Sequence, residues 1–179
     1  MPDTANFGIT YPSNTGHTRI WEHLQVLADD ADAALVDVEK QPCCIARRAV
    51  ALSIPNNVVT AVTFDTEEFD NDGCFTASST NVTVKTAGVY SISATCSFAI
   101  NATGVRFMDV LVNGTKVNGA YSFTAGAGNP TTLTATCLRL CAVNDIVTMT
   151  AYQTSGGALN VEGPGWTPCR LAFVRVSAA

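Results

Sequence analysis

Charged side chains are scarce in this sequence. Asp, Glu, Lys and Arg make up only 14% of the 179 residues, whereas hydrophobic residues make up 47%. This composition argues against disorder and provides enough apolar material for one compact core. Ten basic residues stand against fifteen acidic ones, which gives a formal net charge of −5. We therefore expect no nucleic-acid partner, because no basic stripe is available to follow a phosphate backbone.

The start of the sequence does not have the pattern of a secretory leader, and long apolar runs are absent from the sequence. Its opening, MPDTANFGITYPSNTGHT, has neither a basic start nor an apolar segment. No apolar stretch approaches the roughly 20 residues that cross a bilayer as a helix. We therefore expect no signal peptide, no membrane insertion, and synthesis in a cytoplasm.

Histidine is nearly absent, and the cysteines follow no metal-binding spacing. The two histidines, His17 and His23, precede the first cysteine, and no C-x-x-C pair occurs. A zinc site is therefore not indicated. Without a leader, a disulfide framework is not expected either, and most of the cysteines are interpreted as small buried apolar residues. The seven cysteines are Cys43, Cys44, Cys74, Cys96, Cys137, Cys141 and Cys169.

Acidic residues gather in one stretch, FDTEEFDNDGCF, at positions 64–75. A calcium loop of the EF-hand type needs a glutamate beyond its last variable ligand, and none follows here. We interpret the stretch as a solvated turn between two strands, formed at Asp72-Gly73. Calcium binding by Asp65, Asp70 or Asp72 is the alternative that stays open.

No arrangement of residues points to catalysis. Both histidines lie outside the β-rich part of the chain, so a Ser-His-Asp triad is not indicated. A glycosidase needs two carboxylates that face each other across a cleft, and the spacing of the candidates carries no such specificity. Those candidates are Glu67, Glu68, Asp70 and Glu162. We expect a protein that is not an enzyme and that has no cofactor.

Residues 1–17 are rich in Pro, Gly, Asn and Thr and are expected to form an extended arm. The arm holds Phe7, Ile9 and Tyr11 at alternate positions, flanked by turn-forming residues. It is too short to build a core, but such a triplet suits the addition of a strand to a neighbour's sheet edge. We predict that these side chains anchor the chain in a larger assembly.

Residues 18–41 have the composition of a helix, with Thr18 as its N-cap and Pro42 ending it. Its apolar positions follow the spacing 4, 3, 4, 3, 4, which is a heptad seam. The seam consists of Ile20, Leu24, Leu27, Ala31, Ala34 and Val38. The acidic second half opposes the helix dipole, so the helix is marginal alone and we predict that it packs with partner helices. An amphipathic helix packed on its own domain is the alternative.

Residues 42–179 change to short β-branched runs separated by Gly and Asn. Residues 90–100 alternate between apolar and small polar side chains, which is typical of a half-buried strand and places Cys96 on its inner face. Asn113-Gly114 suits a tight hairpin turn. Further strands are expected at 58–64, 82–85, 105–112, 133–141, 146–152 and 171–176. Many short strands without alternating helices predict an antiparallel sandwich.

Two of these strands carry apolar residues on both faces. Leu171 and Phe173 oppose Ala172, Val174 and Val176 in one strand, and Leu138 and Leu140 oppose Ala135 and Cys137 in the other. An antiparallel sandwich normally leaves one face of each sheet in contact with water. We therefore expect a second buried surface, formed between copies of the domain.

Several segments resemble the complement-1q/tumour-necrosis-factor-like jelly-roll family, over roughly residues 45–177. They are AVTFDTEEFDNDGCF, NVTVKTAGVYSISATCSFAI, VRFMDVLVNGTKV, LRLCAVNDIVTMTAYQ and RLAFVRV. This chain has Asn144-Asp145 where the family usually has Gly-Asp, and Asn tolerates the same left-handed backbone. The resemblance implies a jelly-roll sandwich in a threefold head, often on a trimeric stalk. Together with the heptad seam, it predicts an N-terminal helix in a trimeric coiled coil.

The opening NFGITYP, followed by an acidic, Ala-rich helix, is similar to the start of tail-fibre and minor tail proteins of actinobacterial phages. This second resemblance implies a homotrimeric virion protein, a short tail fibre or minor tail protein, whose arm contacts other virion proteins. We expect its head to bind a carbohydrate of the host cell surface through exposed loops, such as residues 126–130 and 156–157. The alternative is a capsid decoration or head-fibre protein with a purely structural role.

Overall fold

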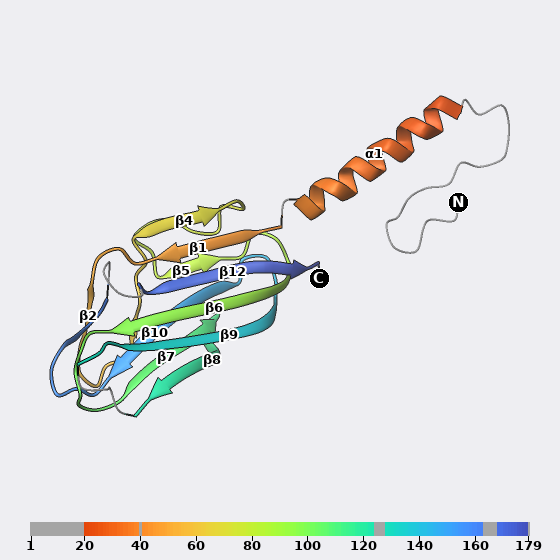
Figure 1. Ribbon diagram of the computed structural model, residues 1–179. Coiled ribbons are helices and arrows are strands. Elements are labelled where there is room, and N and C mark those ends of the chain that lie inside the picture. The colour runs from red at the N-terminus through yellow and green to blue at the C-terminus, as the bar shows by residue number, and fades with distance from the viewer. Residues whose placement is uncertain (1–19, 40, 124–127, 163–167, 179) are drawn as a thin grey trace. The chain divides into compact units, whose positions relative to one another are not determined.

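A computed structural model describes residues 20–39, 41–123, 128–162 and 168–178. The chain divides into two compact units, residues 1–41 and 42–179. The described part of the first unit is a helix, and the second unit, the head, is built from strands (Figure 1). Among the described residues, no helix is both long and apolar enough to cross a membrane.

Helix α1 runs from Ile20 to Glu39, which corresponds to a length of about 30 Å. One turn of it is reinforced by Gln25, whose side-chain amide donates to Asp29 at 2.8 Å. Its last turn contains no basic residue, so no cation there offsets the helix dipole. The structure thus has a helix where the sequence predicts one, while its association into a coiled coil stays a prediction.

The head is an antiparallel sandwich of two sheets, as the sequence predicts (Figure 1). In the described residues the first sheet has seven strands: β1 (Cys43–Arg47), β2 (Leu52–Ile54), β4 (Thr66–Asp70), β6 (Gly88–Phe98), β9 (Thr131–Cys141), β11 (Leu159–Val161) and β12 (Arg170–Ser177). The second has five: β3 (Thr60–Ala61), β5 (Asn81–Thr83), β7 (Arg106–Val112), β8 (Thr115–Ser122) and β10 (Ile146–Gln153).

Strand β6 is the centre of the first sheet. It pairs with β9 along one edge, and with β12 and then β11 along the other. Beyond β12 lie β1 and the edge strand β4, and beyond β11 lies β2. In the second sheet, β10 pairs with β7 on one side and with β5 and β3 on the other, and β8 forms the outer edge beyond β7. The hairpin between β7 and β8 turns at Asn113-Gly114, where both residues have positive φ angles, as predicted.

Strand direction gives the head two distinct ends. Strand β1 begins and β12 finishes at one end, which we call the entry end because the chain enters the head there. Strand β6 finishes and β7 begins at the opposite end, which we call the loop end. The hairpin at Asn113-Gly114 therefore lies at the entry end, whereas residues 99–105 and 154–158 lie at the loop end.

The core lies between the two sheets and is made from the alternate, inward-facing residues of the long strands. Tyr90 on β6 and Phe173 on β12 are fully buried there and stack nearly parallel, with ring centroids 4.0 Å apart. The Tyr90 hydroxyl donates to the carbonyl of Thr86 at 2.6 Å, which satisfies its one polar group. Met108 on β7 and Met149 on β10 are also fully buried, on the inner face of the second sheet.

Two buried polar side chains fix the loop end. Arg106 is fully buried, and its guanidinium donates to the carbonyls of Thr103, Val105 and Asn101 at 2.9–3.0 Å. Gln153, also buried, donates to Ile54 and Gly157 and accepts from the backbone N–H of Ser155. Each side chain replaces several water molecules with fixed partners, so the loops on both sides are held by the strands beneath them.

One interpretation of the sequence was wrong. The acidic residues 66–70, expected in a solvated turn, form strand β4, which pairs antiparallel with β1. The turn that follows includes Gly73, at φ 67°, which agrees with the turn position predicted at Asp72-Gly73. The run expected at 58–64 contributes only the two residues of β3 and one bridge, between Phe64 and Ser79. Short strands β1, β2 and β11 were not predicted.

Candidate interaction surfaces

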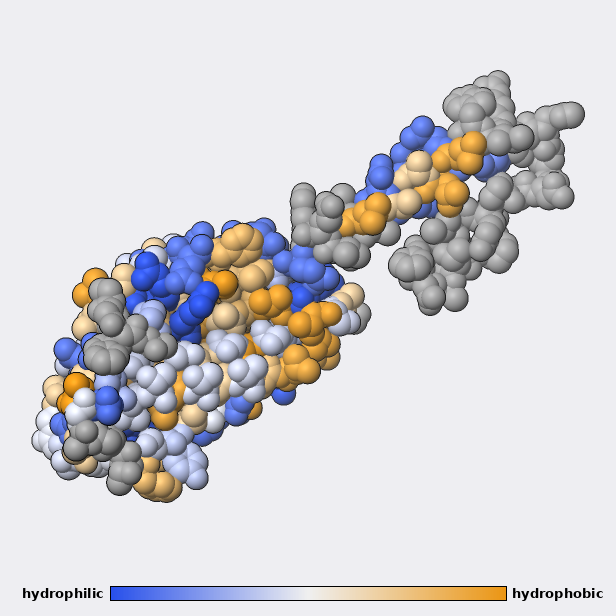
Figure 2. Space-filling model, viewed as in Figure 1, coloured by the Kyte–Doolittle hydropathy of each residue, from blue (hydrophilic) through white to orange (hydrophobic). Residues whose placement is uncertain are grey.

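The outer face of the first sheet is exposed and apolar at the entry end. Five side chains form what we call the aliphatic patch: Val89, Leu138, Leu140, Val174 and Val176. Leu140 of β9 is paired with Val89 of β6. Two residues further along β6, on the same face, Ser91 lies between Leu138 of β9 and Val174 of β12. Leu138 is 68% exposed and Leu140 is 63% exposed. Figure 2 shows hydrophobic residues gathered at the end of this face where β12 finishes.

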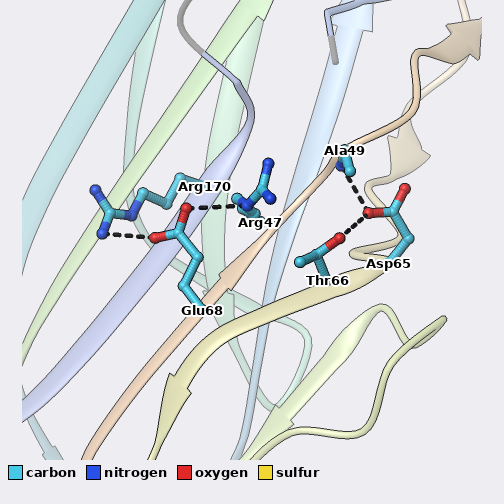
Figure 3. Close-up of polar contacts among 6 residues, drawn as sticks. All are labelled: Arg47, Ala49, Asp65, Thr66, Glu68 and Arg170. Atoms are coloured by element: carbon cyan, nitrogen blue, oxygen red, sulfur yellow. Dashed lines mark hydrogen bonds and ion pairs between the residues drawn. The ribbon is translucent and has the colours of Figure 1, made fainter. Parts of the chain in front are cut away.

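Toward the loop end the same face becomes polar. Hydroxyl pairs bridge β6 and β9: Thr136 donates to Ser93 at 3.2 Å, and Ser97 and Thr132 lie 3.0 Å apart. On the other side of β6, Glu68 of β4 lies between two arginines, 3.1 Å from Arg47 and 2.8 Å from Arg170 (Figure 3). One face therefore offers an aliphatic half and a half of hydroxyls and paired charges.

The prediction that two strands carry apolar residues on both faces is confirmed. Leu171 and Phe173 are buried in the core, whereas Ala172, Val174 and Val176 lie on the outer face. Strand β9 likewise buries Ala135 and packs the half-buried Cys137 against the core, while Leu138 and Leu140 are exposed.

The carboxylates of the acidic stretch serve the local backbone. Asp65 accepts from the N–H of Ala49 at 2.6 Å and from the hydroxyl of Thr66 (Figure 3). It also accepts from the N–H of Val50 at 3.1 Å. Asp70 accepts from two backbone N–H groups of the following turn, including that of Phe75 at 2.8 Å. In the described ranges no group of three or more His, Cys, Asp or Glu residues is placed to hold a metal ion.

The other nominated residues are dispersed. Glu67 is exposed on β4, Glu68 binds the two arginines, and Glu162 follows β11. His23 lies on α1, in the other unit of the chain. Of the heptad seam, Leu24, Leu27 and Ala31 have described side chains and all three are exposed. The side chains of Ile20, Ala34 and Val38, and the whole arm with Phe7, Ile9 and Tyr11, lie outside the described residues.

Replacing Asp65 by Asn should weaken the head and flatten its response to acid. Burial raises the pKa of Asp65, but the hydrogen bonds from Ala49, Thr66 and Val50, with the charge of Arg48, together lower it below the usual value. A lowered pKa stabilises the fold above the unfolded value of about 3.9, and this stabilisation is lost as the pH falls through the folded pKa. We expect Asp65→Asn to cost about 1 kcal/mol at pH 7 and less at pH 3.

This expectation is measured by urea denaturation at the two pH values. Glu67→Gln is the matched control, since it also removes one acidic charge two residues away, from an exposed side chain. Equal losses for Asp65→Asn at pH 7 and pH 3 would contradict the assignment.

All seven cysteines are free thiols, and five of them are buried. Cys96 lies on the inner face of β6, as predicted, and burial raises the pKa of its thiol. Its sulfur is 3.3 Å from that of Cys169, a pairing that the sequence spacing did not reveal. A covalent disulfide requires about 2.05 Å, so the pair is packed but not bonded.

Reductant should therefore leave the melting temperature almost unchanged. Alkylation of the unfolded chain without reductant should label all seven cysteines. A fall of many degrees on reduction, or five labelled cysteines, would show a structural disulfide and contradict this expectation. Cys43, half-buried on the outer face of β1, is the thiol available for contact between copies, because Cys44 points into the core.

A row of aromatic side chains was missed by the sequence analysis. Phe107, Tyr121 and Tyr152 occupy one register position on β7, β8 and β10, and Phe123 follows just beyond β8. We call these four residues the aromatic row. All lie on the outer face of the second sheet, because their neighbours Arg106, Met108 and Ala151 point inward and are buried. The sequence does not give the pairing register of β7, β8 and β10, which brings these residues together. Each aromatic residue alone is typical of a strand.

Comparisons with known proteins identify the fold. No protein-family model and no curated protein sequence matches this chain. The globular domain of zebrafish complement 1qA is similar at 13% identity and a TM-score of 0.57, covering 77% of this chain and 99% of that domain. Murine APRIL is similar at 16% identity and 0.59, covering 76% and 100%, and Eiger TNF from S. frugiperda at 8% and 0.60, covering 78% and 95%. The head therefore has the jelly-roll fold of C1q/TNF-like domains.

Proposed function

We propose that this chain is the protomer of a homotrimeric bacteriophage structural protein, a short tail fibre or minor tail protein. In this proposal the arm joins other virion proteins, the helix forms a trimeric coiled coil, and the head projects from the virion and binds the host cell surface. The observation that carries the assembly is the aliphatic patch on β9, β6 and β12 of the first sheet.

The patch supports association of copies because exposed aliphatic side chains gain free energy by leaving water. Leu138 and Leu140 lie on the edge strand β9 and Val174 lies two strands away, so the patch spans a wide part of the face. It carries no charge of its own, which is typical of the centre of a stable interface. The C1q/TNF-like fold supports threefold symmetry for this association.

Helix α1 supports the same assembly. Leu24 is 59% exposed and Leu27 is 47% exposed, three residues apart on the predicted seam. Isolated helices of this length are marginal in water, and this one lacks favourable charges in its last turn. Packing of three such seams would bury these leucines and stabilise the helix.

The virion role rests on the N-terminal resemblance, and it is tested by removing the arm. Deleting residues 2–16 should leave a folded, soluble trimer that no longer joins particles, since neither the predicted seam nor the aliphatic patch is touched. Incorporation is measured by complementing a phage that lacks the protein and quantifying it in purified virions. Normal incorporation of the truncated protein would contradict the anchoring role and favour the capsid-decoration alternative.

Host binding is measured separately with the isolated trimer. Fluorescently labelled trimer should adsorb to host cells and compete with phage adsorption. Binding to empty capsid shells, without adsorption to cells, would instead support a decoration protein with a structural role.

A further inference from the structure

The aromatic row is a continuous line of four rings near the loop end of the head. Successive ring centroids are 5.0 Å apart from Phe123 to Tyr121, 5.7 Å from Tyr121 to Phe107, and 5.8 Å from Phe107 to Tyr152. Phe107 and Tyr121 lie within 29° of parallel, whereas the rings of Phe123 and Tyr152 stand at 75° and 64° to their neighbours. The row therefore consists of two nearly parallel rings, Phe107 and Tyr121, with a ring at a large angle to its neighbour at each end.

The exposure of these rings to solvent is not explained by a role in stabilising the sheet. Cross-strand aromatic pairs do stabilise sheets, and the pair Phe107–Tyr121 serves that purpose. Yet Tyr121 is 60% exposed and Phe123 is 66% exposed. Phe123 also follows the last residue of β8, so it has no cross-strand partner in the sheet.

Polar groups line the next register position on the same face. Asp109 lies between Gly119 of β8 and Thr150 of β10. Because Gly119 has no side chain, the Asp109 carboxylate occupies its space, and one oxygen, Oδ1, binds the ammonium of Lys116 at 2.6 Å. No described residue is hydrogen-bonded to the other oxygen. At the far side of the row, the Tyr152 hydroxyl contacts the side chain of Asn57 at 3.3 Å.

This combination favours a neutral, polyhydroxylated ligand. Among the described residues beside the row, the acid Asp109 and the base Lys116 neutralise each other, so these charges select neither an anion nor a cation. Aromatic rings stack on the C–H faces of sugars, and carboxylate and amide oxygens accept hydrogen bonds from sugar hydroxyls. The spacing of the rings, 5.0–5.8 Å, is similar to the length of one sugar ring in an oligosaccharide.

A protein partner fits the row less well. An aromatic side chain covers about 150–250 Å² in total, and half of this row is itself partly buried. The area on offer is therefore well below the roughly 800 Å² per partner of a stable protein interface. The aliphatic patch, which has no hydrogen-bonding groups of this kind, is the surface suited to another copy.

We propose that the aromatic row and Asp109 form a binding site for a neutral oligosaccharide. Sugar rings stack on Tyr121 and Phe107 between the rings at the two ends, and the Asp109 carboxylate accepts hydrogen bonds from the sugar hydroxyls. The inference rests on the proposed host-binding function and names its ligand class and site, which is a sheet face and not the loops 126–130 and 156–157.

The test uses the full-length protein on an array of immobilised neutral and anionic oligosaccharides of one to six rings. We expect binding to a subset of the neutral oligomers, with weaker binding to shorter ones. Tyr121→Ala and Asp109→Asn should each reduce the apparent affinity at least tenfold. Tyr121→Phe should retain most of it, because the ring remains.

Phe69→Ala is the matched control, since Phe69 is also an exposed aromatic residue on a strand, but on β4 of the other sheet. It should bind like the unaltered protein, and the melting temperatures of all variants should agree within a few degrees. Binding of anionic oligomers alone, no binding at all, or equal binding by Tyr121→Ala would each overturn the proposal.

Cell adsorption separates this inference from the proposed function. Unchanged adsorption by Tyr121→Ala would overturn the site and leave the host-binding function standing. Oligosaccharide binding without adsorption to host cells would support the site and overturn host binding.

Discussion

Replacing Leu138 by Asp should convert the proposed trimer of heads into monomers. The side chain lies in the aliphatic patch on β9, and the proposed assembly would bury three copies of it. Burial of three unpaired carboxylates away from solvent costs several kcal/mol, which opposes the association of the three copies. The expected result is a threefold lower mass by light scattering at micromolar concentration, measured on residues 42–179 so that the helix cannot hold the copies together.

Ile146→Asp is the matched control for this substitution. Ile146 is also an exposed aliphatic residue on a strand, but it lies on β10 in the second sheet. It should leave the trimer intact. If the unaltered protein is already a monomer, or if Leu138→Asp remains trimeric while Ile146→Asp dissociates, the aliphatic patch is not the interface.

Replacing Phe173 by Ala should destabilise the head by about 3–5 kcal/mol, the range for removing a buried aromatic side chain. Phe173 is fully buried on β12 and stacks on Tyr90 at 4.0 Å, so the substitution opens a cavity beside a large ring. The strands on both sides, β6 and β1, hold the backbone and limit how far the cavity can collapse. For a domain of this size the melting temperature should fall by about 10 °C.

Urea denaturation of the head measures this loss, and Tyr90→Phe provides the comparison. That change keeps the stacked ring and removes only the hydrogen bond to Thr86, so it should cost about 1–2 kcal/mol. A smaller loss for Phe173→Ala than for Tyr90→Phe would contradict the central place of this pair in the core.

The sequence predicts the long strands because their side chains alternate clearly. In β6 and β10, small or apolar inward residues alternate with Ser and Thr, and both strands lie within two residues of their expected bounds. Strand β4 was missed because its residues, TEEFD, have no apolar alternation: it is an edge strand whose carboxylates face solvent and arginines. Pairing with β1 decides its conformation, and local composition does not indicate this pairing.

The candidate surfaces were predictable to different degrees. The aliphatic patch could be inferred from β9 and β12, because each strand displays both of its apolar faces within its own sequence. The aromatic row could not, because Phe107, Tyr121 and Tyr152 come from three separate segments that only the register brings together. The contact between Cys96 and Cys169 was hidden for the same reason, since 73 residues separate the two.

The antiparallel pairing of β1 with β12 has a practical consequence for engineering. Cys43, where the head begins, pairs with Val174, close to where it finishes, so both chain ends of the head leave from the same side. A fluorescent protein or affinity tag fused behind β12 would therefore emerge at the entry end. Such a fusion would leave the loop end of the sandwich unobstructed, so a position behind β12 is suitable for a label.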